Sequence, residues 1–301
     1  IWISGHSLLF FNFFLKLAGA AALRMDGASC KPWQYAIGRK DGTRAIVHQL
    51  REHKRKGHTI FKMDQKNAYG EMPKRLVELM LSNPHNRYLK AYFRNVCYCP
   101  RTLAVYGESR LRKMIMGDGF GQGDATSSFL FCLGLDHILQ NIHDDATAAG
   151  VLIEAVYAYM DDVTWVTKNA ADAHVVAQIA ERRFAEWAMK INMQSEKSAC
   201  MIPDGDPAWN EPTGSVVESL RMMQFNVQRT SEQFVVVGAD ISDDPRDFLV
   251  KYSERQDRFF QLLRGIDMHP ALLFTILRFC GNPRLRYICQ VMPPCKHLQA
   301  L

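Results

Sequence analysis

Closely spaced cysteine pairs are missing from this sequence, although it contains 8 cysteines in 301 residues. No two cysteines have the Cys-x-x-Cys spacing, and Cys97-Tyr98-Cys99 is too tight for a usual zinc ligand pair. Cys132 and Cys280 lie in apolar runs, so we expect both to be buried thiols. The pattern argues against a disulfide framework. It favours a reducing, intracellular compartment without distinguishing the nucleus from the cytoplasm.

Long hydrophobic runs are scarce. Residues 7–23 (SLLFFNFFLKLAGAAAL) are apolar and end in small residues, as a signal peptide does. However, no basic stretch precedes them, Asn12 and Lys16 interrupt them, and they are short for a bilayer span. We therefore expect a core helix here and no membrane partner. Because the chain begins at Ile1 rather than at a methionine, we also expect it to be a fragment of a longer protein.

Internal repeats and low-complexity segments are also absent. What is present is ordinary globular composition, 48% hydrophobic and 23% charged, which is enough for a sizeable core. The length indicates about two domains, or one large domain with lobes. The net charge of +6 is compatible with a polyanionic partner such as nucleic acid.

The spacing of apolar residues predicts an α+β fold. We expect strands at 59–64, 151–159 and 163–168, a hairpin at 102–116 that turns at 107–109, a glycine-rich loop at 117–124, and helices starting at Pro73 and covering 86–98, 126–142 and 170–189. This order predicts an antiparallel sheet backed by helices. After residue 245 the pattern is wholly helical, with breaks near Gly265, Gly281 and Pro283, which marks a boundary to a smaller lobe.

Three Asp-Asp pairs occur, and they differ in their surroundings. Asp144-Asp145 closes a helical pattern and Asp243-Asp244 precedes Pro245, so we expect both to be solvated turns, the second capping a helix. Asp161-Asp162 is flanked by apolar strand patterns on both sides. Burying either carboxylate without a partner costs several kcal/mol. A tight hairpin that displays both carboxylates to a divalent cation would resolve this conflict.

Asp64 ends the strand pattern TIFKMD and could project toward the same place. One aspartate from a strand end and two from a hairpin could hold two metal ions a few Å apart. Two such ions activate an attacking hydroxyl and stabilise the leaving oxygen in phosphoryl transfer. Alternatively, Asp64 merely starts a turn.

Several motifs, in order, resemble those of reverse transcriptases. YMDD (159–162) is similar to the YxDD signature of that family, FKMDQKNAYGEMPK (61–74) to its first catalytic motif, and GFGQGDATSSFLF (119–131) to its Gly-Gln-Gly loop. INMQSEKSACMI (191–202) resembles the stretch that carries a lysine after the catalytic hairpin. VVVGADI (235–241) resembles the hairpin that grips the primer end. Residues 33–52 and 272–294 resemble the flanking segments of non-LTR-type retroelement polymerases, so the resemblance covers nearly the whole chain.

The resemblance implies a role for each matching residue. Asp64, Asp161 and Asp162 would hold two Mg²⁺ ions, with Mn²⁺ as an alternative, and the backbone carbonyl of Gln65 would touch one of them. The remaining matches are Tyr69 beneath the sugar of the incoming nucleotide, Gly121, Gln122 and Gly123 beside the nucleotide and templating base, Lys197 near the departing pyrophosphate, and Tyr159 at the primer terminus. Taken singly, these residues could equally be core aromatics, a flexible loop and a surface charge.

The resemblance also implies an architecture. It is the palm of a right-hand polymerase, an antiparallel sheet backed by helices. We expect partial fingers over 1–58, the palm with inserted fingers elements over 59–244, and a truncated, helical, thumb-like region over 245–301. No endonuclease, RNase H or integrase motif is evident in the sequence.

We therefore expect an RNA-directed DNA polymerase from a retroelement. It would extend the 3′-OH of a nucleic-acid primer on an RNA template with deoxynucleoside triphosphates. The sequence departs from the family at Ala125 and Ser127-Ser128, where prolines are common, and the basic start of the fingers motif is not evident before residues 3–9. These departures keep open a catalytically decayed or maturase-like RNA-binding protein of the same fold. An unrelated metal-dependent phosphotransferase is a further alternative.

Overall fold

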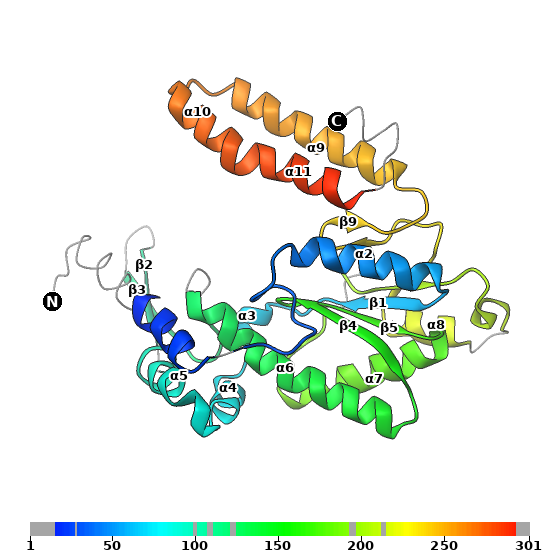
Figure 1. The fold of residues 1–301 in the computed structure, drawn as a ribbon, viewed down its shortest axis with the longest axis horizontal. Helices are drawn as coiled ribbons and strands as arrows, with labels where there is room; N and C mark the ends of the chain where they lie inside the picture. The colour runs from blue at the N-terminus through cyan, green and yellow to red at the C-terminus, as the bar shows by residue number, and fades with distance from the viewer. Residues whose placement is uncertain are drawn as a thin grey trace.

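The computed structural model describes residues 16–27, 29–98, 101–106, 111–120, 125–192, 197–211 and 215–292. Its centre is a five-stranded sheet in the order β4-β5-β1-β6-β7 (Figure 1). The strands are β1 (Thr59–Met63), β4 (Ile153–Tyr159), β5 (Asp162–Thr167), β6 (Ala199–Ile202) and β7 (Asn226–Arg229). All neighbours are antiparallel except β6 and β7, which run parallel. The predicted α+β class is confirmed, with one parallel pair at the sheet edge that we had not expected.

Helices cover both faces of this sheet (Figure 1). Helices α6 (Ala125–Ala148) and α7 (Ala170–Glu186) lie on one face, and α2 (Gly42–Arg55) lies on the other. Smaller helical elements surround them: α3 (Ala68–Glu71), α4 (Lys74–Met80), η1 (Pro84–Asn86), α5 (Arg87–Tyr92), η2 (Phe93–Cys97), η3 (Pro207–Asn210) and α8 (Val216–Met222). Of the core helix that we expected over 7–23, residues 7–15 lie outside the described residues. Residues 16–25 are helical, but only Gly19 and Ala22 among them are buried. None of the helices in the described part of the chain is both long and apolar enough for a bilayer crossing.

Successive side chains of β1 point to opposite faces of the sheet and so pack against different helices. Phe61 and Met63 join the apolar cluster with α6 and α7, and Phe61 stacks on Trp165 of β5 with ring centroids 5.3 Å apart. Ile60 points the opposite way, into the cluster that contains residues of α2. Because successive strand residues alternate between faces, Lys62 and the residue after the strand end, Asp64, share the face of Ile60.

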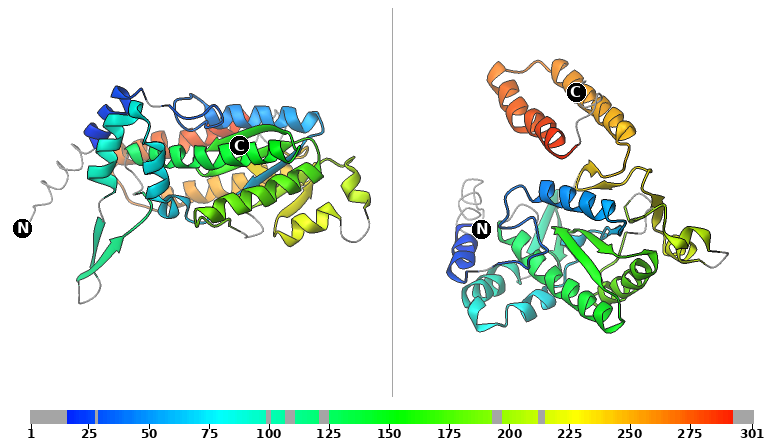
Figure 2. Two further views of the ribbon diagram at one scale, coloured as in Figure 1. Left: turned by 90° about the horizontal axis from the view of Figure 1, so that it is seen from below. Right: turned by 45° about the vertical axis from the view of Figure 1, so that its right-hand side comes forward.

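Two small hairpins lie outside the main sheet. Strands β2 (Arg101–Tyr106) and β3 (Leu111–Met116) form the predicted hairpin, which projects from the body of the molecule (Figure 2). Strands β8 (Val235–Val236) and β9 (Ala239–Asp240) form the second, between the sheet and the C-terminal helices (Figure 1). The turn of the first hairpin lies outside the described residues, as do Gly121, Gln122 and Gly123 of the predicted loop.

The C-terminal part is a pair of antiparallel helical arms standing away from the sheet (Figure 1). One arm is α9 (Arg246–Arg264), and the other runs through α10 (Pro270–Ile276), η4 (Leu277–Gly281) and α11 (Asn282–Val291). The predicted break near Gly265 is confirmed. The break predicted near Gly281 and Pro283 is wrong, because a π-helical turn carries the chain through Gly281 and Pro283 falls in the first turn of α11, where its missing N–H needs no partner.

Three further local expectations are corrected. Cys280 is exposed rather than buried, because it lies on that π-helical turn away from the sheet, whereas Cys132 is buried as expected. Pro73 precedes the first residue of α4 instead of occupying it. Helix α6 continues to Ala148, so Asp145 is not in a solvated turn. It accepts hydrogen bonds at 2.7 Å from Arg182 and Arg183 of α7.

Candidate active site

The β4-β5 hairpin displays its two aspartates at the tip. Tyr159 pairs with Asp162, which leaves Met160 and Asp161 as a two-residue turn. Met160 has a φ of 57°, and a positive φ at the first turn residue suits the twist of a tight hairpin. For a residue other than glycine this conformation costs about 1–2 kcal/mol. The turn is therefore a locally unfavourable structure that its neighbours must hold in place.

Asp64 lies opposite this turn, immediately after β1. Its neighbour Met63 pairs with Val163 of β5, so the strand end and the hairpin tip are adjacent. Asn192 fixes Asp64 on both sides. Its side-chain amide donates to the Asp64 carboxylate at 2.8 Å, and its backbone N–H donates to the Asp64 carbonyl at 2.7 Å. The Asp64 N–H donates to the Ser198 hydroxyl at 3.3 Å.

The three carboxylates interact electrostatically. The pKa of Asp161 is raised, first by burial and then by the charge of Asp64. The pKa of Asp162 is also raised, by burial and by the charges of Asp161 and Asp64. Lys197 acts in the opposite direction on both residues. The charges of Asp64, Asp161 and Asp162 therefore act on one another, and their role as metal ligands stays a prediction.

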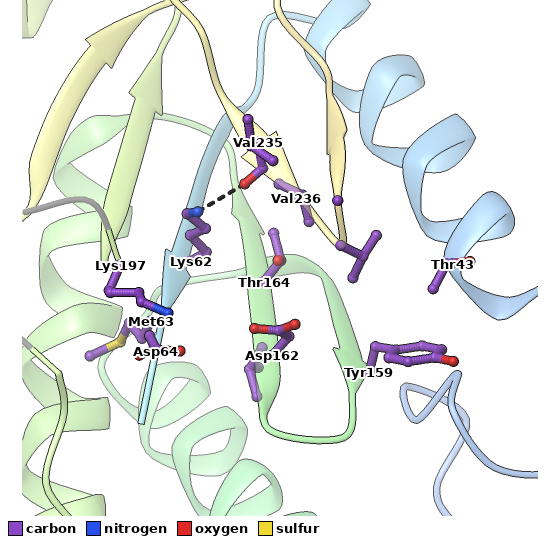
Figure 3. A pocket seen from close by; sticks show the side chains of 13 residues that line it. Thr43, Lys62, Met63, Asp64, Tyr159, Asp162, Thr164, Lys197, Val235 and Val236 are labelled. Carbon is purple, nitrogen blue, oxygen red and sulfur yellow. Dashed lines mark hydrogen bonds between the residues drawn. The ribbon is translucent and has the colours of Figure 1, made fainter. Parts of the chain in front are cut away.

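Asp64, Asp162 and Lys197 line a cavity of about 430 Å³ (Figure 3). Its lining comes from five places in the chain: strand β1, the β4-β5 hairpin, Lys197, the β8-β9 hairpin and Thr43 of α2. Tyr159 and Asp162 both line it, and Lys197 points toward Asp64 in Figure 3. Segments more than 190 residues apart in sequence (43 and 238) therefore meet at one concave surface.

Lys62 is a site residue that the motif comparison missed. Its amino group donates to the Val235 carbonyl of β8 at 2.8 Å (dashed in Figure 3). Burial lowers its pKa, while the charges of Asp162 and Asp64 oppose that shift. The signal was present in the sequence, since a lysine in the middle of a buried, apolar strand calls for an acceptor.

Tyr69 lies against the Met160-Asp161 turn. Its ring stacks on Phe131 of α6 with centroids 4.5 Å apart and planes at 11°. Its hydroxyl group approaches the Ser128 hydroxyl at 3.2 Å and the Met160 sulfur at 3.4 Å. The pKa of Tyr69 is raised, mainly by burial. Tyr69 is thus held rigidly against the turn that carries Asp161.

Gln65, the last of the predicted site residues, is buried and forms a single bridge with Ile191. Neither its amide oxygen nor its amide nitrogen has a hydrogen-bond partner within the described ranges. Gly121, Gln122 and Gly123 cannot be placed, because they lie outside those ranges. The chain just before them is fixed, since Gly119 and Phe120 donate to the carbonyls of Met72 and Tyr69 at 3.0 and 2.8 Å.

Gly119 gives a direct test of this packing. Its φ is 82°, and a Cβ atom there would lie 2.3 Å from the Gly70 carbonyl oxygen. We expect Gly119→Ala to lower the free energy of unfolding by about 2 kcal/mol or more, because strained backbone and a backbone clash add. Urea denaturation measures the change. Gly117→Ala is the matched control, because nothing lies within 4 Å of its Cβ position. Equal effects of the two substitutions would contradict this account.

The site fits divalent cations only in part. Among the residues described here, no three or more His, Cys, Asp or Glu side chains are grouped closely enough to hold a metal ion alone. The donors that do converge are carboxylates, which are hard oxygen ligands, and their mutual repulsion would be relieved by a cation. Mg²⁺ in particular is usually bound by one or two carboxylates, with substrate phosphates and water completing its shell.

Comparison with known proteins gives a family match over most of the chain. The family described as "Reverse transcriptase (RNA-dependent DNA polymerase)" matches residues 17–241. None of the curated proteins matches the chain.

Several solved structures match part of this chain. Apo telomerase from Candida tropicalis is 13% identical, with a TM-score of 0.45 over 75% of this chain and 38% of that one. Telomerase from Candida albicans, in complex with a fragment of telomeric RNA, is 14% identical, with a TM-score of 0.39 over 94% and 47%. The BmCPV RNA-dependent RNA polymerase is 10% identical, with a TM-score of 0.39 over 64% and 18%. The chain spans less than half the length of each.

Proposed function

Because the chain belongs to the reverse transcriptase (RNA-dependent DNA polymerase) family, we propose that it extends the 3′-OH of a nucleic-acid primer on an RNA template with deoxynucleoside triphosphates. The family assignment makes the sheet and its helices a right-hand polymerase palm and the chain a nucleic-acid polymerase domain. The observation that supports the finer proposal is that Asp64 and Asp162 line one cavity with Lys62 and Lys197, while the charge of Asp161 acts on Asp162 from the adjacent turn. An unrelated phosphotransferase is set aside by the same family match.

Asp64, Asp161 and Asp162 would hold the two Mg²⁺ ions. When bound, the ions would supply activation of the primer hydroxyl and stabilisation of the leaving oxygen. The protein's own part is to keep the carboxylates in place before substrate arrives. Asn192 and Ser198 do this for Asp64, and the paired ends of β4 and β5 do it for Asp161 and Asp162.

The other site residues suit the two substrates. Lys197 is exposed beside the carboxylates, where a cation could compensate the charge of a departing pyrophosphate. Tyr159 and the β8-β9 hairpin line the cavity on the side away from Lys197 (Figure 3), and we assign the primer end to that side. Tyr69, across the turn, is then free to contact the sugar of the incoming nucleotide.

Primer extension tests the proposal directly. A labelled DNA primer on an RNA template should be lengthened in the presence of Mg²⁺ and all four dNTPs, with each added base set by the template. Chelation of the metal with EDTA should stop the reaction. Nucleic-acid binding without extension, under conditions where the protein is folded, would favour the decayed or maturase-like alternative and contradict the proposed activity.

The affinity for primer–template should depend strongly on salt. Lys and Arg contacts to phosphate release condensed counterions, so the dissociation constant should rise by about 100-fold or more between about 50 and 200 mM salt. Fluorescence anisotropy of a labelled RNA–DNA duplex measures this. An affinity that does not change over that range would contradict both the polymerase and the RNA-binding alternative.

A further inference from the structure

The segment that precedes α2 forms an extra edge beside the catalytic hairpin. The N–H of Tyr35 donates to the Ala158 carbonyl at 2.7 Å, and the Ala158 N–H donates to the Trp33 carbonyl at 2.8 Å. Gln34, between them, forms a parallel bridge with Ala158. The segment thus continues the sheet past β4, next to the end of the strand that leads into the Met160-Asp161 turn.

A buried carboxylate fixes the same segment from the other side. Asp136 of α6 is 3% exposed and accepts hydrogen bonds from the Lys31 N–H at 2.9 Å and the Trp33 indole N–H at 2.8 Å. Asp136 is not part of the candidate active site. Its two bonds tie the segment to a long, rigid helix, so the backbone of Gln34 is held between α6 and β4.

From this position the side chain of Gln34 reaches the catalytic turn. Gln34 is 1% exposed, and its amide oxygen accepts hydrogen bonds from the Met160 N–H at 3.0 Å and the Ala36 N–H at 3.2 Å. Its amide nitrogen has no hydrogen-bond partner in the described part of the chain. The amide oxygen therefore makes the hydrogen bonds of this side chain, and one of them goes to Met160, the residue with the positive φ.

We propose that Gln34 is a positioning residue for the polymerase reaction, holding Met160 in its left-handed conformation so that the Asp161 carboxylate faces Asp64. This inference rests on the proposed function. Rotation about the Met160 backbone moves Asp161 directly, because Asp161 is the next residue. The Met160 sulfur contacts Tyr69 and Cys132, so the side chain is packed as well. Gln34 supplies the hydrogen bond to the backbone N–H, which packing cannot replace.

Gln34→Met tests the inference, because methionine has a similar length and shape but no amide oxygen. We expect kcat for primer extension to fall at least tenfold, with the KM values for dNTP and primer–template within about threefold of the original. Gln49→Met is the matched control. Gln49 accepts a hydrogen bond from the Tyr35 hydroxyl at 2.9 Å, in the same region but away from the turn. Its kcat should stay within about twofold of the original.

A second readout does not depend on activity. In protein labelled at the methionine methyl groups, the Met160 resonance, assigned with Met160→Leu, should shift or broaden in Gln34→Met and stay unchanged in Gln49→Met. If Gln34→Met does not fold, Gln34→Asn replaces it, since asparagine keeps a buried amide but is one methylene too short to reach Met160.

The outcomes separate the two proposals. An unchanged kcat and an unchanged Met160 resonance would overturn the role of Gln34, as would equal losses in the Gln34 and Gln49 variants. If the original protein does not extend primers, the proposed function fails. The methyl resonance then still decides whether Gln34 holds the turn.

Discussion

Asp161→Asn is expected to reduce primer extension by at least about 10³-fold, equivalent to roughly 4 kcal/mol of transition-state stabilisation. The amide keeps the shape of the side chain and removes the charge that would bind metal. The variant should still fold, because burial and the charge of Asp64 already disfavour the ionised form of Asp161. Removing that charge should leave the thermal midpoint equal or slightly higher. Single-nucleotide extension rates and thermal unfolding measure the two effects.

The chain offers a matched control for this variant. Asp144→Asn alters an aspartate that also belongs to an Asp-Asp pair but is exposed on α6. Its extension rate should equal that of the original protein. Substantial residual activity in Asp161→Asn, within tenfold of the control, would rule out a metal-binding role for Asp161.

Tyr69→Val is expected to lower the preference for deoxyribonucleotides over ribonucleotides by about tenfold or more, or 1.4 kcal/mol. The ring is rigidly stacked on Phe131, so it cannot move aside for a 2′-OH. A 2′-OH that fits but loses its water without gaining a partner costs roughly 1–3 kcal/mol. The measurement is kcat/KM for dGTP and for GTP on one primer–template.

Tyr69→Phe distinguishes the contribution of the ring from that of the hydroxyl group. It loses the contacts to Ser128 and Met160 but keeps the stacked ring, so sugar preference should be retained within about threefold. The competing interpretation is that Tyr69 is simply a core aromatic. In that case Tyr69→Val would depress both activities in parallel and lower stability, with an unchanged ratio.

The strands and the carboxylates could be predicted because their signals are local. Alternation of apolar residues located β1, β4 and β5 to within two residues at each end. The contrast between Asp161-Asp162, inside apolar strand patterns, and the other two pairs predicted a tight hairpin at this pair, which the structure shows. Here the requirement for a buried, repulsive pair was visible in the sequence itself.

The errors arose where a contact from a distant segment overrode a local pattern. Asp145 looked like the polar end of a helix, but Arg182 and Arg183 pair with it, so α6 continues by six residues beyond the predicted end at 142. Cys280 sits in an apolar run that packs only partly, because the helical arm stands off from the sheet (Figure 1).

The supporting polar contacts of the site could not be predicted at all. Gln34 reaches Met160 across 126 positions, and Asn192 reaches Asp64 across 128. Nothing in the spacing of Gln34 or Asn192 distinguishes these residues from surface amides. Only the three-dimensional arrangement shows that Gln34 hydrogen-bonds to the Met160-Asp161 turn and Asn192 to Asp64 at the strand end.

The order of strands in the sheet also has a consequence for how the chain is made. The central strand β1 ends at Met63, but its two neighbours are β5, which starts at Asp162, and β6, which starts at Ala199. At about 5–20 residues per second, a ribosome needs roughly 5–20 s to supply the first partner. During that interval an apolar strand with both edges unpaired is available to other chains. We therefore expect efficient production of soluble protein to depend on slow, cool synthesis or on chaperones that bind exposed apolar strands.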